Sequence, residues 1–146
     1  MTKKLEPEIG FVGIDEADIK WGEIYFADLG PISSFLEGEI GGKRPVLVVQ
    51  NNTGNAHAPS VTVVPLTSSI KKLKQPTHLL LRKGEGGTLK DSIIVTEQVK
   101  TISKKRLKFY MGKLDKEMMK LVMECIAVQI GAFYVIGDHG RREDNI

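Results

Sequence analysis

The chain has 146 residues, a formal net charge of +3 and a hydrophobic fraction of 41%. This length suits one domain with a core of its own, and no apolar run approaches the roughly 18 residues of a membrane-spanning helix. The charge is too small to indicate a nucleic-acid partner by itself, and a single cysteine excludes an internal disulfide. We expect no membrane association and, because no apolar signal segment follows the first residues, a cytoplasmic protein.

Short apolar segments separated by turn residues predict a mainly β protein with helices, built as a small barrel or sandwich. The expected strands cover residues 21–28, 44–50, 61–66, 77–81 and 92–98, with 99–102 extending or redirecting the last one. Pro65 has no N–H, which predicts a sheet edge or a bulge in the third strand. Turns are expected over 51–55 and 84–87, and a short turn of helix over 15–18.

The strongest helical pattern begins at Asp115, a residue suited to an N-cap, and runs to about Ile130. Gly131 is expected to end this helix. Its apolar positions follow the spacing of one helix face, which we expect to cover the sheet: Met118, Leu121, Val122, Cys125 and Ile126. The predicted organisation is an N-terminal extension over 1–19, one domain over 20–133 and a polar, disordered tail over 134–146.

Polar residues lie at the ends of three predicted strands: Arg44, then Thr67-Ser68-Ser69, then Glu97-Gln98. Pro45 pushes Arg44 toward an extended conformation at the start of a strand, beside a long glycine-containing loop over 31–43. In a small barrel such strand ends converge at one rim. A cation with hydroxyls and an amide suits a phosphodiester and an unstacked base; the local alternative is a solvated loop arginine.

Other chemistry is not indicated. The three histidines lack ligand spacing, so neither a metal site nor a cofactor is expected, and His78, next to leucines, is expected to be structural. Lysines and an arginine cluster over 71–74 and 100–108, either as phosphate contacts or as solvated strand edges. Phe35 and Leu36 in the long loop suit a lid, a partner contact or a local plug.

Five segments then occur in an order that is typical of one family. They are Trp21-Gly22-Glu23-Ile24-Tyr25, Gly42-x-Arg44-Pro45 through Asn51, Pro65-Leu66-Thr67-Ser68, Pro76-Thr77-His78 and Asp91 through Thr101. With Gly112-x-Leu114 and Met118-Met119, they resemble the MazF/PemK family of toxin endoribonucleases over about residues 20–130. The chain departs from the family pattern in a longer loop over 31–44 without the usual acidic–amide pair, in Gln75, and in Lys100 where arginine is common.

The resemblance implies a small SH3-like β-barrel with a C-terminal helix, working as a homodimer. It implies sequence-specific, metal-independent cleavage of single-stranded RNA (mRNA), leaving 2′,3′-cyclic phosphate and 5′-hydroxyl ends, and neutralisation by a cognate antitoxin. It also implies catalytic roles for Arg44 and Thr67. The residues that it implies for RNA binding are Ser68, Ser92, Glu97, Gln98 and Lys100.

Two questions stay open at this point. The general base could be Glu37, Glu39, His57 or no side chain at all. The alternative function is a non-catalytic SH3-like barrel that binds nucleic acid or a protein target such as gyrase. Arg44 together with Thr67 favours the enzyme, because a pure binder has no need for both.

Overall fold

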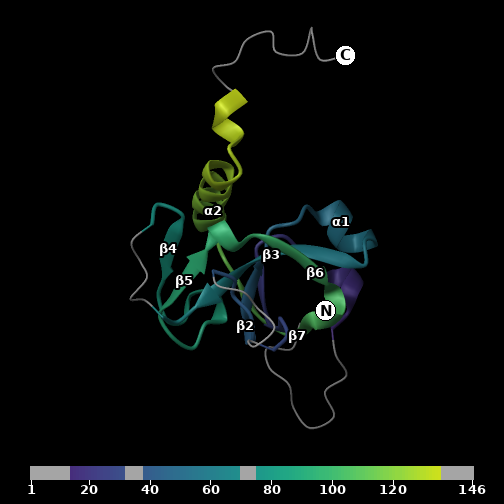
Figure 1. Cartoon of the computed structure of the whole chain (residues 1–146). Helices are drawn as coiled ribbons and strands as arrows, with labels where there is room; N and C mark the ends of the chain where they lie inside the picture. Colours follow the sequence, from purple (N-terminus) through teal and green to yellow (C-terminus); the bar gives the residue numbers. More distant parts are fainter. Residues whose placement is uncertain (1–13, 32–37, 70–74, 136–146) are drawn as a thin grey trace, which may run out of the picture.

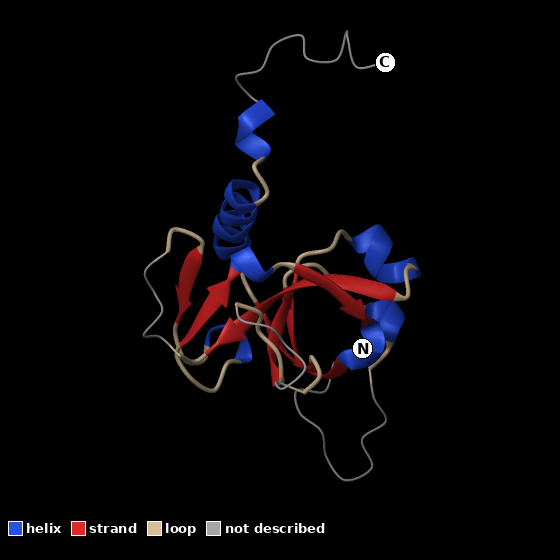
Figure 2. Cartoon of the chain, in the orientation of Figure 1, coloured by secondary structure: helices blue, strands red, loops and turns tan. Residues whose placement is uncertain are grey.

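The computed structural model describes residues 14–31, 38–69 and 75–135. Within them the chain forms a seven-stranded antiparallel sheet that curves around its core, with helices at its ends (Figures 1 and 2). The elements are β1 (Glu23–Asp28), β2 (Lys43–Val48), α1 (Asn52–His57), β3 (Ser60–Thr67), β4 (His78–Leu81), β5 (Ser92–Val95), β6 (Lys100–Ser103), β7 (Leu107–Lys113) and α2 (Lys116–Gln129). The prediction of a mainly β fold with a C-terminal helix is confirmed.

The strands are hydrogen-bonded in the order β4-β5-β3-β2-β1-β7. The remaining strand, β6, also pairs with β3, along a different stretch from the one that pairs with β5. β2 therefore lies inside the sheet, between β1 and β3. Its side chains alternate between two apolar clusters: Val46 and Val48 belong to one and Leu47 to the other, and all three are fully buried. The expectation that this strand is buried on both faces is confirmed.

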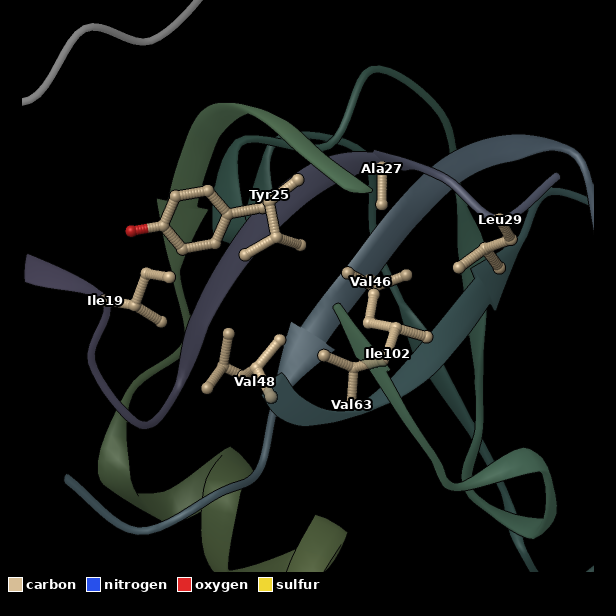
Figure 3. Packing of buried hydrophobic residues seen from close by; sticks show 10 residues of the cluster. Ile19, Tyr25, Ala27, Leu29, Val46, Val48, Val63 and Ile102 are labelled. Atoms are coloured by element: carbon tan, nitrogen blue, oxygen red, sulfur yellow. The ribbon is translucent and has the colours of Figure 1, made fainter. Parts of the chain in front are cut away.

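The first cluster packs inside the curve of the sheet, where Tyr25 and Ile19 lie beside the valines of β2 and β3 (Figure 3). The second cluster lies on the other side of β2. α2 covers it through Met119 and Val122, which are 1% and 0% exposed. Burial of apolar area on both faces fixes the position of β2, and with it the position of Arg44 near its beginning.

The position of Pro65 differs from the expected one, because β3 is an inner strand of the sheet and not an edge strand. β3 pairs with β6 through Ser60–Val63 and with β5 through Leu66 and Thr67. Pro65 falls between these two ladders, where the neighbouring strand changes and no N–H is required on that side. The missing donor is therefore accommodated by a change of partner and not by a bulge.

Three local elements were missed or misplaced. Residues 52–57 form α1 and not only a turn, because the Asn51 side chain caps the helix by accepting from the Gly54 N–H at 2.9 Å. Residues 96–98 leave the sheet as a 3-10 turn, so 99–102 redirects the strand. β7 was not predicted, although Leu107 and Met111 are buried in it, one in each of the two apolar clusters.

The predicted helix is confirmed with small differences in its ends. Asp115 is the N-cap and accepts from the Met118 N–H at 2.8 Å, and Gly131, with a φ of 72°, follows the C-cap. Leu121 was expected on the buried face but is 46% exposed. A 3-10 turn (Ala132–Val135) continues beyond the helix and rises with it away from the strands (Figure 1).

Candidate active site

Arg44 and Thr67 stand opposite one another on neighbouring strands. β2 and β3 pair antiparallel with Val46 against Pro65, and this register carried two residues further sets Arg44 against Thr67. Directly opposed residues of an antiparallel pair present their side chains on the same face. The two residues that the resemblance implies for catalysis are therefore neighbours in space, although they are distant in sequence.

The guanidinium of Arg44 is held by two main-chain carbonyl oxygens. Nε donates to the Gly41 oxygen at 2.8 Å, and Nη1 donates to the Leu66 oxygen at 3.3 Å. A guanidinium has five N–H donors, so these contacts leave three without a partner in the described part of the chain. Burial lowers the pKa of Arg44 from its ordinary value. The group is thus preorganised, partly desolvated and still able to bind an anion.

A cavity of about 380 Å³ lies at the beginning of β2. Arg44, Ser68 and Ser92 line it, so the structure brings these three predicted site residues together. The other lining residues are Phe26, Lys43, Pro45, Leu66, Thr88, Leu89, Lys90, Phe109 and Met111. The rings of Phe26 and Phe109 stack with centroids 5.1 Å apart. The cavity combines an apolar, aromatic wall with cations and hydroxyls, a combination that suits a nucleotide.

Sequence reasoning missed the aromatic wall and two cations of this cavity. Phe26 and Phe109 are partners across β1 and β7. The register of these two strands shifts on either side of Tyr25 and Phe26, so a regular alternation of apolar residues does not reveal the pair. Lys43 and Lys90 are exposed neighbours of Arg44 and Ser92 in the sequence. Nothing in their local sequence distinguishes them from other surface lysines.

Glu97 is engaged by β4 and does not line the cavity. Its Oε2 lies 2.7 Å from His78 Nε2, and its Oε1 accepts from the Thr77 hydroxyl at 3.2 Å. The His78 side chain is 5% exposed and that of Glu97 is 21% exposed. These contacts support the interpretation of His78 as a structural residue. They also give Glu97 a role in joining β4 to the turn after β5.

Gln98 and Lys100 point at the loop before β2. The Gln98 amide nitrogen donates to the Gly38 carbonyl at 2.5 Å, and its oxygen accepts from the Ile40 N–H at 3.4 Å. Lys100 Nζ donates to the Ile40 carbonyl at 2.8 Å. The pKa of Lys100 is lowered, mainly by burial. The negative charge of Glu39 opposes this shift, and the positive charge of Arg44 adds to it. Lys100 and Arg44 are therefore close enough for their charges to interact.

The other sequence candidates fall elsewhere. His57 ends α1, which follows the far end of β2 from Arg44; four residues of strand alone span about 13 Å. His57 therefore lies beyond the other end of β2 from Arg44. Lys104 of the second basic cluster is only 3% exposed, and its Nζ donates to the Asn55 carbonyl. It stabilises α1 instead of offering a surface charge.

Several expectations lie outside the described residues. They concern Phe35, Leu36 and Glu37 of the long loop, the basic residues over 71–74 and the two ends of the chain. Within the described ranges, no group of three or more histidine, cysteine or acidic residues is placed to hold a metal ion. No helix in those ranges is long and apolar enough to span a bilayer.

Comparison with known proteins agrees with this architecture. Residues 20–130 match the family model for the PemK-like, MazF-like toxin of type II toxin–antitoxin systems. The chain is 42% identical over 112 residues to the endoribonuclease EndoA of Bacillus subtilis. The aligned region covers 77% of this chain and 94% of EndoA.

Solved structures of similar proteins share the fold. One is an endoribonuclease in complex with its cognate antitoxin from a mycobacterial species, with a TM-score of 0.63, 25% identity, and coverage of 77% of this chain and 95% of that one. Another is MazF from Deinococcus radiodurans, with a TM-score of 0.65, 17% identity, and coverage of 77% and 96%. The SH3-like description of the curved sheet is compatible with these structures. With its family model matched over most of its length, the chain belongs to the PemK-like, MazF-like toxins of type II toxin–antitoxin systems.

Proposed function

We propose that this chain is a sequence-specific endoribonuclease that cuts single-stranded RNA without a metal ion. At the level of enzyme class the prediction is confirmed, because the chain is an endoribonuclease like its relative EndoA. The finer statements, namely the kind of RNA, the products and the independence from metal, are proposals. A protein that cuts messenger RNA would act where messages are translated, which supports the expected cytoplasmic location.

The observation that carries the proposal is the anchored guanidinium of Arg44, a residue that lines the cavity, with Thr67 opposite Arg44 by the register of β2 and β3. Thr67 itself is not one of the residues that line the cavity. After its two carbonyl contacts, Arg44 keeps three N–H donors that no other residue of the described ranges occupies, and these would face a phosphate. Thr67 offers a hydroxyl on the same face of the sheet. An unstacked base beside the scissile phosphate would fit against the Phe26–Phe109 wall.

In the proposed reaction the substrate's own 2′-hydroxyl is the nucleophile. The bond between the 2′-oxygen and phosphorus forms as the bond between phosphorus and the 5′-oxygen breaks. The 2′-hydroxyl loses its proton and the departing 5′-oxygen gains one, which leaves a 2′,3′-cyclic phosphate and a 5′-hydroxyl. Preorganised donors that face developing negative charge lower the barrier of such a step.

Arg44 would stabilise the negative charge on the phosphoryl oxygens, and Thr67 would donate a hydrogen bond to the same oxygens. An arginine does not act as a base near neutral pH. Arg44 would also donate a hydrogen bond to the leaving oxygen, and burial, which lowers the pKa of Arg44, leaves the guanidinium partly desolvated for this contact.

Incubation of the purified chain with a long single-stranded RNA in excess EDTA tests this proposal. We expect cleavage at a short recurrent sequence, with a cyclic phosphate on each upstream fragment in mass spectra. Intact RNA, or cleavage that appears only after Mg²⁺ is added, would reject the metal-independent mechanism. Inhibition of gyrase supercoiling with intact RNA would favour the alternative of a non-catalytic barrel.

We also propose a cognate antitoxin as the partner, since the mycobacterial relative was solved with one. A flexible acidic segment would match the cations Lys43, Arg44 and Lys90 around the cavity. Such a segment and RNA would compete for the same surface. A tail peptide and an uncleavable RNA that bind together without loss of affinity would contradict the shared site.

A homodimer is the third part of the proposal. Exposed apolar side chains on α2 and the turn after it support an interface there: Leu121, Val128, Ile130, Phe133, Tyr134 and Val135. Patches of this kind on a small protein typically mark contact surfaces. Light scattering at micromolar concentration should give the mass of a dimer, and the mass of a monomer would contradict this part.

A further inference from the structure

The backbone of Gly38–Gly41 is held by side chains that come from elsewhere in the sequence. Gln98 contacts both Gly38 and Ile40, and Lys100 contacts Ile40, across separations of 58 and 60 residues. Arg44 takes the next carbonyl, that of Gly41, at 2.8 Å. Three residues of a connecting segment, Gly38, Ile40 and Gly41, are therefore held by three side chains that the resemblance assigned to RNA or to catalysis.

The end of this segment that leads into β2 is fixed as well. Gly42 adopts a φ of 79°, in the left-handed region that favours glycine. Its N–H donates to the Gly30 carbonyl at 2.8 Å and its carbonyl accepts from the Leu29 N–H at 2.9 Å. The segment thus enters β2 from a defined point, and Gln98 and Lys100 set its course before that point.

Lys100 and Arg44 are both cations, and each donates to a carbonyl of this segment. The pKa of Lys100 is lowered first by burial, and the Arg44 charge lowers it further. The carbonyl oxygens of Ile40 and Gly41 accept from these two cations, one each. Hydrogen bonds from charged donors are stronger than neutral ones, so they offset part of the repulsion and fix the two peptide groups.

We infer that Gln98 and Lys100 are positioning residues that orient Arg44 through the Ile40–Gly41 backbone. They hold Ile40, the residue before Gly41, and the Gly41 carbonyl sets the direction of the Arg44 guanidinium. This assignment rests on the proposed RNA cleavage and differs from the direct RNA contacts that the resemblance implies for both residues. The Gln98 oxygen and one of its amide hydrogens are already committed to the segment.

The kinetic test separates positioning from direct contact. Gln98→Met, which keeps the length of the side chain and removes both hydrogen-bonding groups, should lower kcat by about ten- to a hundredfold, because small misplacements of a catalytic group have effects of that size. KM should change little, and all RNA sequences should be slowed by the same factor. Loss of discrimination at one RNA position with kcat preserved would overturn the inference, because it is the signature of a base contact.

Lys100 offers a conservative variant and a charge-matched control. Lys100→Met should lower kcat. Lys100→Arg keeps a cationic donor and should have a kcat close to that of wild type. Lys120→Met removes one charge from an exposed position of α2 and controls for the loss of charge alone. Equal defects in Lys100→Met and Lys120→Met would overturn the positioning role.

Hydrogen exchange of the RNA-free chain provides a readout that does not depend on cleavage. The Ile40 amide, which donates to Gln98, should exchange about fivefold faster in Gln98→Met, the effect of one ordinary hydrogen bond. The Gly22 amide, which donates to the Val48 carbonyl at 2.9 Å, reports on the intact sheet and should not change. Unchanged exchange at Ile40 would show that Gln98 does not hold the segment. A wild-type chain that cuts no RNA would instead overturn the proposed function, whatever the exchange result.

Discussion

Nη1 of Arg44 lies 3.3 Å from the carbonyl oxygen of Leu66, the residue immediately before Thr67. β3 therefore supplies both an acceptor that orients Arg44 and the hydroxyl that stands opposite it. The guanidinium is tied to the backbone on two sides, by Leu66 and by Gly41. The site is consequently part of the sheet, and its geometry depends on main-chain contacts as much as on side chains.

This geometry predicts that Arg44→Lys is not a conservative change. An ammonium is a point charge and cannot contact two carbonyls while presenting a planar fork to phosphate. We expect cleavage to fall by about a hundredfold or more, a loss typical of a missing preorganised donor. Single-turnover rates measure the effect, and an unchanged circular dichroism spectrum shows that the sheet is intact. A rate within a few-fold of wild type would mean that charge alone is sufficient.

The Thr67 hydroxyl should matter through its hydrogen bond and not through its shape. Thr67→Val keeps the branched side chain of the strand and removes the hydroxyl, and it should slow cleavage by about ten- to a hundredfold. Thr67→Ser restores a hydroxyl and should recover most of the rate. The Thr67 oxygen also accepts from the Ser69 N–H at 3.2 Å, so thermal stability is measured alongside. Equal rates for the Val and Ser variants would show that the hydroxyl has no part in the reaction.

The contact between His78 and Glu97 predicts an effect on stability. His78→Ala leaves Oε2 of the half-buried Glu97 without its imidazole partner, and we expect a loss of about 1–3 kcal/mol in the free energy of unfolding. Urea denaturation followed by fluorescence or circular dichroism measures it. Leu80→Ala, at a partly buried position of the same strand, is a control for simple truncation. If His78→Ala unfolds at the urea concentration of wild type, the pair does not join β4 to the sheet.

Tyr25 predicts a specific sensitivity to high pH. Its ring is 1% exposed and its hydroxyl donates to Glu23 at 2.9 Å; burial, followed by the Glu23 charge, raises its pKa far above the ordinary 10.0. As the pH rises through about 10, the unfolded chain loses this proton and the folded chain keeps it, so stability falls. Tyr25→Phe should flatten that fall between pH 9 and about 11, although it is less stable than wild type at pH 7. Parallel curves for the two proteins would show that Tyr25 does not contribute.

Much of this site could be predicted from the sequence because it depends on strand ends. Arg44 precedes a run of apolar residues and Thr67 follows another, and antiparallel pairing of two such strands brings their ends together. Their register depends on burial of alternating side chains on both faces. Local patterns and the family resemblance therefore indicated the pair that the proposal places at the centre of the site.

What the sequence did not predict depends on contacts between distant segments. The anchoring of Ile40 by Gln98 and Lys100 joins parts of the chain about sixty residues apart, and no local pattern encodes such a contact. α1 was hidden because Asn51 and Gly54 suggest a turn until the side-chain cap is seen. β7 was hidden because lysines interrupt its apolar residues, and the Phe26–Phe109 wall was missed with it.

The most direct test of the account is the cleavage rate of Arg44→Ala relative to wild type on one labelled RNA in EDTA. The account predicts a rate lower by about 100- to 1,000-fold, with wild type leaving 2′,3′-cyclic phosphate ends and the variant still folded as a sheet with the same thermal stability within a few degrees. A folded Arg44→Ala variant that cuts at the wild-type rate would contradict the account, because Arg44 would then contribute nothing to the transition state.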